Sequence, residues 1–181
     1  MTLDIIDLVK EDHARIAQAA ALLQENFEAW PTMEAADAEV RESLEEGRIS
    51  RVLVNPEGDV LGWIGGISQY SGNVWELHPL VVDKSYRKQG LGMKLVLDLE
   101  EQVRQRGGVT IYLGTDDEYD QTSLSGKDLY SDIPGHIQQF QSPDHPANFY
   151  RKAGFTIVGV IPDANGIGKP DILMAKRVTG R

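Results

Sequence analysis

The chain has 181 residues and a formal net charge of −10, from 18 basic and 28 acidic side chains. This balance argues against a protein that binds nucleic acid or an anionic membrane, because both partners call for cations that neutralise phosphates. No cysteine is present, which excludes disulfides, thiolate nucleophiles and cysteine-bound zinc. Solubility and a cationic small-molecule partner both explain the excess of acid, and composition alone leaves both open.

The N-terminal residues contain no basic segment followed by an apolar one, so we expect no signal peptide. The sequence also lacks the run of about 18 apolar residues that a transmembrane helix needs. We therefore expect a cytoplasmic protein without a membrane partner.

A short strand and two helices are expected at the start of the chain. The strand covers residues 3–9, and residues 11–27 place apolar side chains at the spacing of one helix face. Trp30-Pro31 should end this helix, because a residue before proline disfavours the helical conformation. A second helix is predicted over residues 34–46.

Strands dominate the rest of the chain. Alternating and β-branched runs between turn sequences predict strands at 49–55, 59–70, 73–83, 108–117, 156–161 and 171–178, the fourth of them buried. Helices are expected from residue 91 and over 145–155, and residues 118–142 read as a long polar loop with room for one short helix. We predict one domain, residues 1–181, of the α+β class, with a mixed, mostly antiparallel central sheet flanked by helices on both faces.

The motif Arg-Lys-Gln-Gly-Leu-Gly, residues 87–92, stands where a predicted strand becomes a helix. A helix N-terminus exposes free N–H groups and about half a positive charge, which favours an anion. Gly90 and Gly92 let the backbone approach a bulky anion, and Arg87 and Lys88 add charge. The pattern is neither a P-loop nor a Rossmann fingerprint, so a different pyrophosphate site, or an ordinary turn with surface cations, is expected.

The spacing R-x-x-G-x-G after a strand, with "NFYRKAGF" at 148–155, resembles the GNAT acetyltransferase superfamily. "WELHPLVV", "FYRKAGFTIVGVIPDANG" and "KPDILMAK" are similar to aminoglycoside 6′-N-acetyltransferases, and this similarity runs over about residues 26–177. The resemblance implies a GNAT-like fold, acetyl-CoA as co-substrate, a homodimer, and transfer of the acetyl group to the 6′-amine of an aminoglycoside. An enzyme of antibiotic resistance is thereby expected.

The resemblance also implies which residues bind the coenzyme. The strand before the motif would lie along the pantetheine arm, the motif would hold the pyrophosphate, and the second motif would add one amide. These residues are Leu80, Val81, Val82, Arg87, Lys88, Gln89, Gly90, Leu91, Gly92, Met93 and Asn148.

Acetyl transfer needs a neutral amine, whereas an alkyl amine has a reference pKa near ~10.4 and is an ammonium ion at neutral pH. Glu76 is the candidate base, because burial beside Trp75 would strengthen a carboxylate as a base; a salt-bridged strand glutamate is the alternative. His78 should share a strand face with Glu76, unless Pro79 introduces a bulge. His78 would either relay a proton or have only a structural role.

Two further catalytic roles come from the resemblance alone. The backbone N–H of Leu80 would hold the oxyanion, and Tyr150 would give a proton to the leaving thiolate; aromatic packing is the alternative for Tyr150. No Gly-x-Ser-x-Gly elbow is present, and the four histidines lack metal-ligand spacing. Direct transfer in a ternary complex, without a metal, is therefore expected.

The acidic segment "TDDEYD", residues 115–120, follows a predicted strand. Asp116 and Asp117 would attract a cationic acceptor, together with Glu76, while Trp30 and Tyr70 would pack against a sugar ring. A solvated loop explains the same segment. Two other functions also remain open: acetylation of another amine, such as a polyamine or a protein lysine, and a non-catalytic acyl-CoA-binding module.

Overall fold

The computed structural model describes residues 3–180, and the chain divides into two compact units. The first comprises Met1–Val109 with Val178–Arg181, and the second comprises Thr110–Arg177. None of the helices in the described residues is long and apolar enough to cross a membrane.

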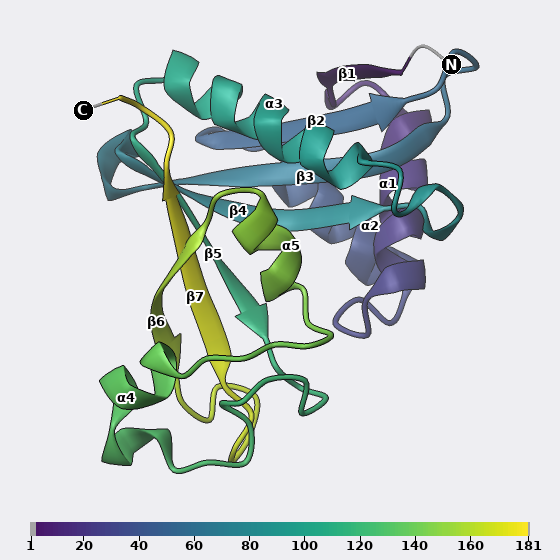
Figure 1. The fold of residues 1–181 in the computed structure, drawn as a ribbon. Coiled ribbons are helices and arrows are strands. Elements are labelled where there is room, and N and C mark those ends of the chain that lie inside the picture. Colours follow the sequence, from purple (N-terminus) through teal and green to yellow (C-terminus); the bar gives the residue numbers. More distant parts are fainter. Residues whose placement is uncertain (1–2, 181) are drawn as a thin grey trace. The chain divides into compact units, whose positions relative to one another are not determined.

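The first unit is an antiparallel sheet with helices on both faces (Figure 1). Its strands are hydrogen-bonded in the order β1-β2-β3-β4. The elements are β1 (Asp4–Asp7), α1 (His13–Asn26), α2 (Met33–Glu42), β2 (Arg48–Val54), β3 (Val60–Gln69), β4 (Val74–Val82) and α3 (Leu91–Gln105). The predicted second helix ends at Glu42 instead of residue 46, because the chain turns at Ser43.

Each face of this sheet carries its own apolar layer. The layer under α1 and α2 contains Ile16, Leu23, Val52 and the fully buried Trp63. On the other face α3 lies close to the sheet, where a Cβ built on Gly66 would be 3.0 Å from Leu99 Cδ1. Glycine on β3 therefore sets how closely α3 can pack.

A bulge in β4 changes which side chains face which layer. Register runs from Gly66↔Leu77 to Ile64↔Leu80, so His78 and Pro79 together oppose Gly65. A Cβ on Gly65 would lie 2.2 Å from the carbonyl oxygen of His78, so only glycine fits there. The predicted bulge at Pro79 is confirmed. Because of it, the even-numbered side chains of β4 face one layer before the bulge and the other layer after it.

The second unit is a three-stranded antiparallel sheet with two short helices. Its strands are β5 (Thr110–Asp116), β6 (Thr156–Ile161) and β7 (Asp171–Arg177), with β7 in the centre, and its helices are α4 (Ile133–Gln138) and α5 (Ala147–Lys152). β5 alternates buried and less buried residues, because one of its faces is only partly covered. The prediction of a buried strand there was wrong in that respect. The α+β class and the mostly antiparallel strands are confirmed.

Candidate functional site

The loop between β4 and α3 presents the free N-terminus of a long helix. Gly90 occupies the N-cap with a left-handed φ of 83°, and no side chain caps α3. Leu91 is buried and anchors the first turn. A Cβ on Gly90 would have no atom within 4 Å, so the space beside the loop is open. The N–H groups of the first turn can therefore receive an anion.

Two cations of the loop, Lys84 and Arg87, are directed at neutral acceptors. The guanidinium of Arg87 donates to Asn26 Oδ1 and to the carbonyl oxygen of Val82, and Lys84 Nζ lies 2.6 Å from the carbonyl oxygen of Glu25. Neutral acceptors orient a cation without neutralising it. Arg87 thus keeps its positive charge in the loop that leads into α3.

Replacing Gly90 with alanine is expected to weaken acetyl-CoA binding by about tenfold or more, because a Cβ adds ~1–2 kcal/mol of backbone strain at positive φ and narrows the anion's approach. Gly107→Ala is the matched control. Gly107 follows the other end of α3, has a φ of 79°, and likewise has open space. Both variants should lose similar stability by denaturation, whereas calorimetry should show weaker coenzyme binding only for Gly90→Ala. Equal affinities would remove the loop from the binding site.

Glu76 and His78 lie on the face of β4 that points toward α1 and α2. The contact of His78 with Glu39 on α2 places the imidazole on this face. Glu76 lies two residues earlier in the same strand, so its side chain points to the same face. Trp75 lies on the opposite face, beside Gly66 and Gly108. The expectation that Trp75 shields Glu76 was therefore wrong, because successive strand residues point to opposite faces.

Trp30, Glu39 and His78, which we call the imidazole cluster, come from three elements. The Trp30 and His78 rings have centroids 5.9 Å apart, and His78 Nε2 lies 3.5 Å from Glu39 Oε1. Trp30 precedes α2 and packs edge-on against Phe27. Tyr70 instead lies in the β3–β4 turn and is 77% exposed. Of the two aromatic residues predicted to line the acceptor site, the structure places Trp30 beside His78.

In the second unit, Asp116 and Asp117 have different environments. Asp117 is fully buried, and its carboxylate accepts hydrogen bonds from the N–H groups of Gln121 and Thr122 and from the Ser125 hydroxyl. Burial would raise the pKa of Asp117, but these hydrogen bonds outweigh it and the net shift is downward. Asp116 is exposed, with its Oδ1 2.5 Å from Asn165 Nδ2. Of these two side chains, Asp116 is the one open to a ligand.

Helix α5 carries Asn148 and Tyr150. The amide of Asn148 donates to the carbonyl oxygen of Ser142 and accepts from the Ser142 hydroxyl, so it already orders the chain before the helix. The Tyr150 ring packs against Phe149 and Phe155. Tyr150 keeps some exposed surface, yet burial raises the pKa of its phenol to about 12. The phenol therefore stays protonated throughout the physiological range.

Alkaline titration should detect the raised pKa of the Tyr150 phenol. Because the pKa of Tyr150 is raised on folding, its protonated form stabilises the native state below the unfolded value near ~10, and this contribution is lost as the pH approaches 12. A difference titration between the wild-type protein and Tyr150→Phe, followed by tyrosinate absorbance, is expected to show one phenol that ionises near pH 12. If the phenol that Tyr150→Phe removes from the titration instead ionises near pH ~10, this assignment is wrong.

Sequence reasoning missed Glu39 and Gly65. The sequence does not distinguish Glu39 from the other acidic residues on its amphipathic helix. Gly65 could have been found, since glycine inside a strand suggests a bulge.

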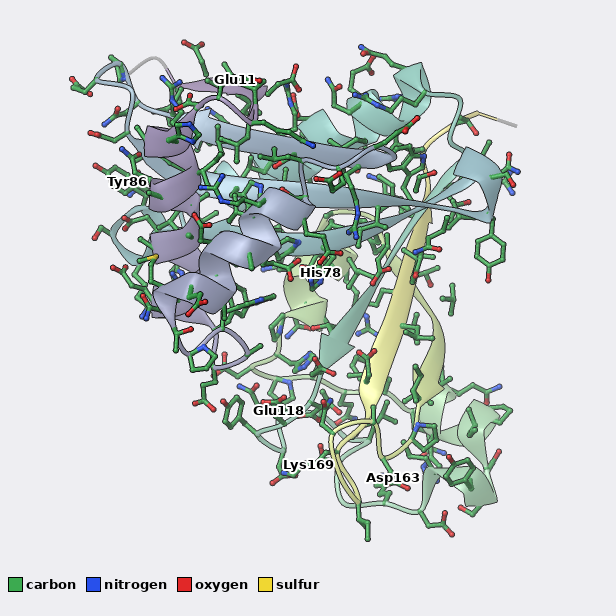
Figure 2. All side chains as sticks on the ribbon, turned by 180° about the vertical axis from the view of Figure 1, so that it is seen from behind. Glu11, His78, Tyr86, Glu118, Asp163 and Lys169 are labelled. Atoms are coloured by element: carbon green, nitrogen blue, oxygen red, sulfur yellow. The ribbon has the colours of Figure 1, made fainter. Side chains whose placement is uncertain are left out.

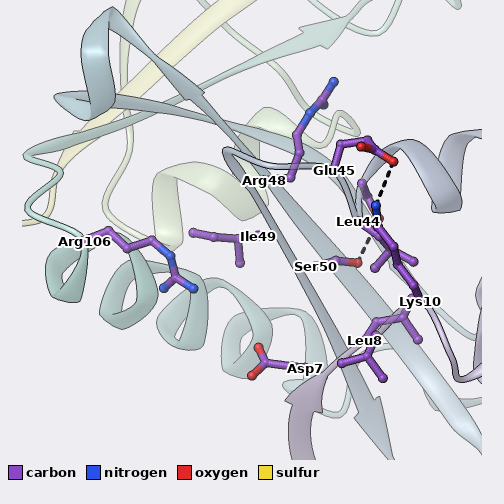
Figure 3. A pocket seen from close by; sticks show the side chains of 11 residues that line it. Asp7, Leu8, Lys10, Leu44, Glu45, Arg48, Ile49, Ser50 and Arg106 are labelled. Atoms are coloured by element: carbon purple, nitrogen blue, oxygen red, sulfur yellow. Dashed lines mark hydrogen bonds and ion pairs between the residues drawn. The ribbon is translucent and has the colours of Figure 1, made fainter.

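A cavity of about 340 Å³ in the first unit is lined by Asp7, Lys10, Glu45, Arg48 and Arg106, and by none of the predicted site residues (Figure 3). Within residues 3–180, no group of three or more potential ligands is placed to hold a metal.

A bulged strand that leads through a left-handed glycine into an uncapped helix is typical of one class of protein. The family described as "Acetyltransferase (GNAT) family" matches residues 16–125, and the chain belongs to it. The comparison with curated proteins gave no match.

Solved structures give a narrower similarity. An aminoglycoside 6′-N-acetyltransferase complexed with coenzyme A is 41% identical, with a TM-score of 0.92 and 98% of each chain covered. The aminoglycoside 6′-N-acetyltransferase from Enterococcus faecium is also 41% identical, with a TM-score of 0.90 and the same coverage. An aminoglycoside 6′-acetyltransferase type Ii is 37% identical, with a TM-score of 0.77, 98% of this chain and 99% of that one covered.

Proposed function

We propose that this protein transfers the acetyl group of acetyl-CoA to the 6′-amine of an aminoglycoside. The observation that carries the proposal is the 41% identity over 98% of the chain to aminoglycoside 6′-N-acetyltransferases, one of them complexed with coenzyme A. The open N-terminus of α3 supports it, because it supplies N–H groups for the coenzyme's pyrophosphate. Leu80, Val81 and Val82 would hold the pantetheine arm, and residues 87–93 would hold the phosphates.

The reaction forms an amide from an amine and a thioester. Glu76 takes a proton from the acceptor's ammonium group, and the neutral amine attacks the thioester carbonyl. The Leu80 N–H receives the oxyanion, and the intermediate then releases the thiolate of coenzyme A. The products are the N-acetylated acceptor, the free thiol of coenzyme A and one proton for the solvent.

Tyr150 is assigned the hydrogen bond to the leaving thiolate. A thiol has a reference pKa near ~8.5, whereas burial raises the pKa of Tyr150 to about 12. Full proton transfer from this phenol to the thiolate would be uphill by several pKa units. Tyr150 therefore stabilises the thiolate as a donor that keeps its proton, and the second proton of the amine finally neutralises the sulfur.

We assign acceptor binding to Asp116 and loop order to Asp117. Asp116→Asn is expected to raise the KM for an aminoglycoside about threefold, because one exposed carboxylate that attracts a cation is lost. Asp117→Asn should instead lower the free energy of unfolding by ~1–3 kcal/mol, since three donors lose the buried anion that they share. Steady-state kinetics and chemical denaturation of both variants separate the roles. A loss of stability in Asp116→Asn together with a higher KM in Asp117→Asn would exchange the two roles.

The proposed activity is tested by following thiol release from acetyl-CoA. Acceptors should include an aminoglycoside with a 6′-amine, one with a 6′-hydroxyl, spermidine and a lysine peptide. Turnover with the 6′-amine and none with the 6′-hydroxyl analogue supports the proposal. Turnover only with spermidine or peptide would assign another acceptor, and acetyl-CoA binding without turnover on any amine would indicate a binding module.

We further propose that residues 1–181 work as one catalytic domain, since the family match over 16–125 includes parts of both units. A homodimer in the cytoplasm and a role in antibiotic resistance complete the proposal. Sedimentation of the purified protein tests the dimer. Growth of a sensitive strain that expresses the chain, in the presence of an aminoglycoside, tests resistance.

A further inference from the structure

The imidazole cluster contains a charged group to which the proposed reaction gives no role. Glu39 lies on α2 with a side chain only 22% exposed, and its Oε1 is 3.5 Å from His78 Nε2. The Trp30 ring packs against the imidazole, and its indole helps lower the pKa of the same carboxylate. Figure 2 shows His78 on the side of the sheet that α2 covers. The carboxylate is thus held from two sides, and one of them is the imidazole.

The charge of this carboxylate is stable near neutral pH. Hydrogen bonding from His78 lowers the pKa of Glu39 most; burial opposes this shift, and His78, Trp30 and the charge of Arg48 lower it further. Arg48 also pairs with Glu42 at 2.5 Å. The other charged group on the same face of β4 is Glu76. His78 thus has the Glu39 carboxylate at Nε2 and shares its strand face with a second carboxylate, that of Glu76.

We propose that Glu39 is a positioning residue for acetyl transfer: with Trp30, it holds His78 so that Nε2 carries the hydrogen and Nδ1 receives the proton removed by Glu76. The inference rests on the proposed function. A partner at one ring nitrogen fixes the tautomer of a neutral histidine, and a carboxylate there stabilises the imidazolium.

The proton balance closes without another reactant. The acceptor's ammonium proton passes to Glu76 and then to Nδ1 of His78, which forms an imidazolium ion. The imidazolium releases its Nδ1 proton to water, because the His78 side chain is 41% exposed, and the Nε2–H tautomer is restored. Glu39 remains a carboxylate throughout and acts by its charge and its position. Glu76 is thereby restored as an anion for the next turnover.

The tautomer is tested without catalysis, by NMR of protein labelled with ¹⁵N-histidine. The protein has four histidines, and His78→Asn assigns the signals of His78. Nε2–H is expected to predominate in the wild-type protein and in Glu39→Gln, whose amide oxygen still accepts a hydrogen bond. Glu39→Ala should lose this preference. Asp37→Asn, which removes an exposed carboxylate paired with Arg41 on the same helix, should leave it unchanged.

The catalytic effect is tested by a double-mutant cycle on kcat with acetyl-CoA and kanamycin A, which carries a 6′-amine. Glu39→Gln is expected to lower kcat about tenfold with KM nearly unchanged, and His78→Asn should lower it at least as much. The double variant should equal His78→Asn alone, since Glu39 acts through the imidazole.

Three results would overturn the proposal. A tautomer that does not respond to Glu39→Ala would remove the positioning role. Losses in kcat that multiply in the double variant would show that Glu39 and His78 act independently. A higher KM with unchanged kcat would make Glu39 a binding group for the acceptor. If the wild-type protein acetylates no aminoglycoside, the proposed acceptor fails, and the NMR measurement still decides whether Glu39 positions His78.

Discussion

Glu76→Gln is expected to lower kcat by about 10²–10⁴-fold, the usual contribution of a general base. The amide keeps the shape of the side chain but cannot take the ammonium proton. Coenzyme binding should stay unchanged, because the proposed pyrophosphate site lies in the loop before α3. Glu101→Gln, which removes an exposed glutamate paired with Arg104 on α3, is the control for charge.

The measurement is kcat for thiol release across about pH 6–9, with acetyl-CoA affinity determined separately by calorimetry. The loss should be smallest at the alkaline end, where more of the amine is already neutral in solution. A kcat for Glu76→Gln that matches the wild-type value at every pH would remove Glu76 as the base. His78 would then have to take the ammonium proton directly.

Gly65→Ala is expected to damage both the fold and the site. Its Cβ would lie 2.2 Å from the carbonyl oxygen and 3.1 Å from the carbonyl carbon of His78, and backbone atoms cannot move aside as a flexible side chain can. Overpacking in a core costs ~1–3 kcal/mol, and more where backbone must shift. We expect a loss of ~3 kcal/mol in the free energy of unfolding, with a kcat at least tenfold lower, because the shift displaces His78.

Gly159→Ala is the control for an added methyl group on a strand. Its Cβ would meet only Leu173 Cδ1, at 3.7 Å, which is an ordinary contact. The two variants are compared by chemical denaturation, and kcat is measured for each variant that folds. Similar and small losses in the two variants would show that the bulge is tolerant and does not fix the position of His78.

Glu76 and His78 share a face of β4 because they lie before the bulge, whereas Leu80 lies beyond it, where the strand has reversed phase. The same irregularity therefore separates the proposed proton path, on the α2 side, from the segment proposed to hold the pantetheine arm. A regular strand would have put all three side chains on one face.

The sequence by itself determined the elements, their order and the family. Apolar spacing in residues 11–27 and 91–103 and the run at 156–161 depend on neighbours a few positions away, so local patterns are enough to predict them. The glycine motif at 87–92 is likewise local, since strand, loop and helix follow one another directly. These features indicated the α+β class and an anion site, and their resemblance to the GNAT acetyltransferases implied acetyl-CoA as its ligand.

Only the tertiary structure decided which side chains meet. Trp75 faces α3 and not Glu76, Asp117 is buried inside its loop while Asp116 is exposed, and Glu39 on α2 reaches His78 on β4. Each outcome depends on how elements distant in sequence pack, and on one extra residue in β4 that shifts every later side chain by half a period. Residue type and spacing contain no signal for such contacts, because an acid on an amphipathic helix reads the same whether it meets water or an imidazole.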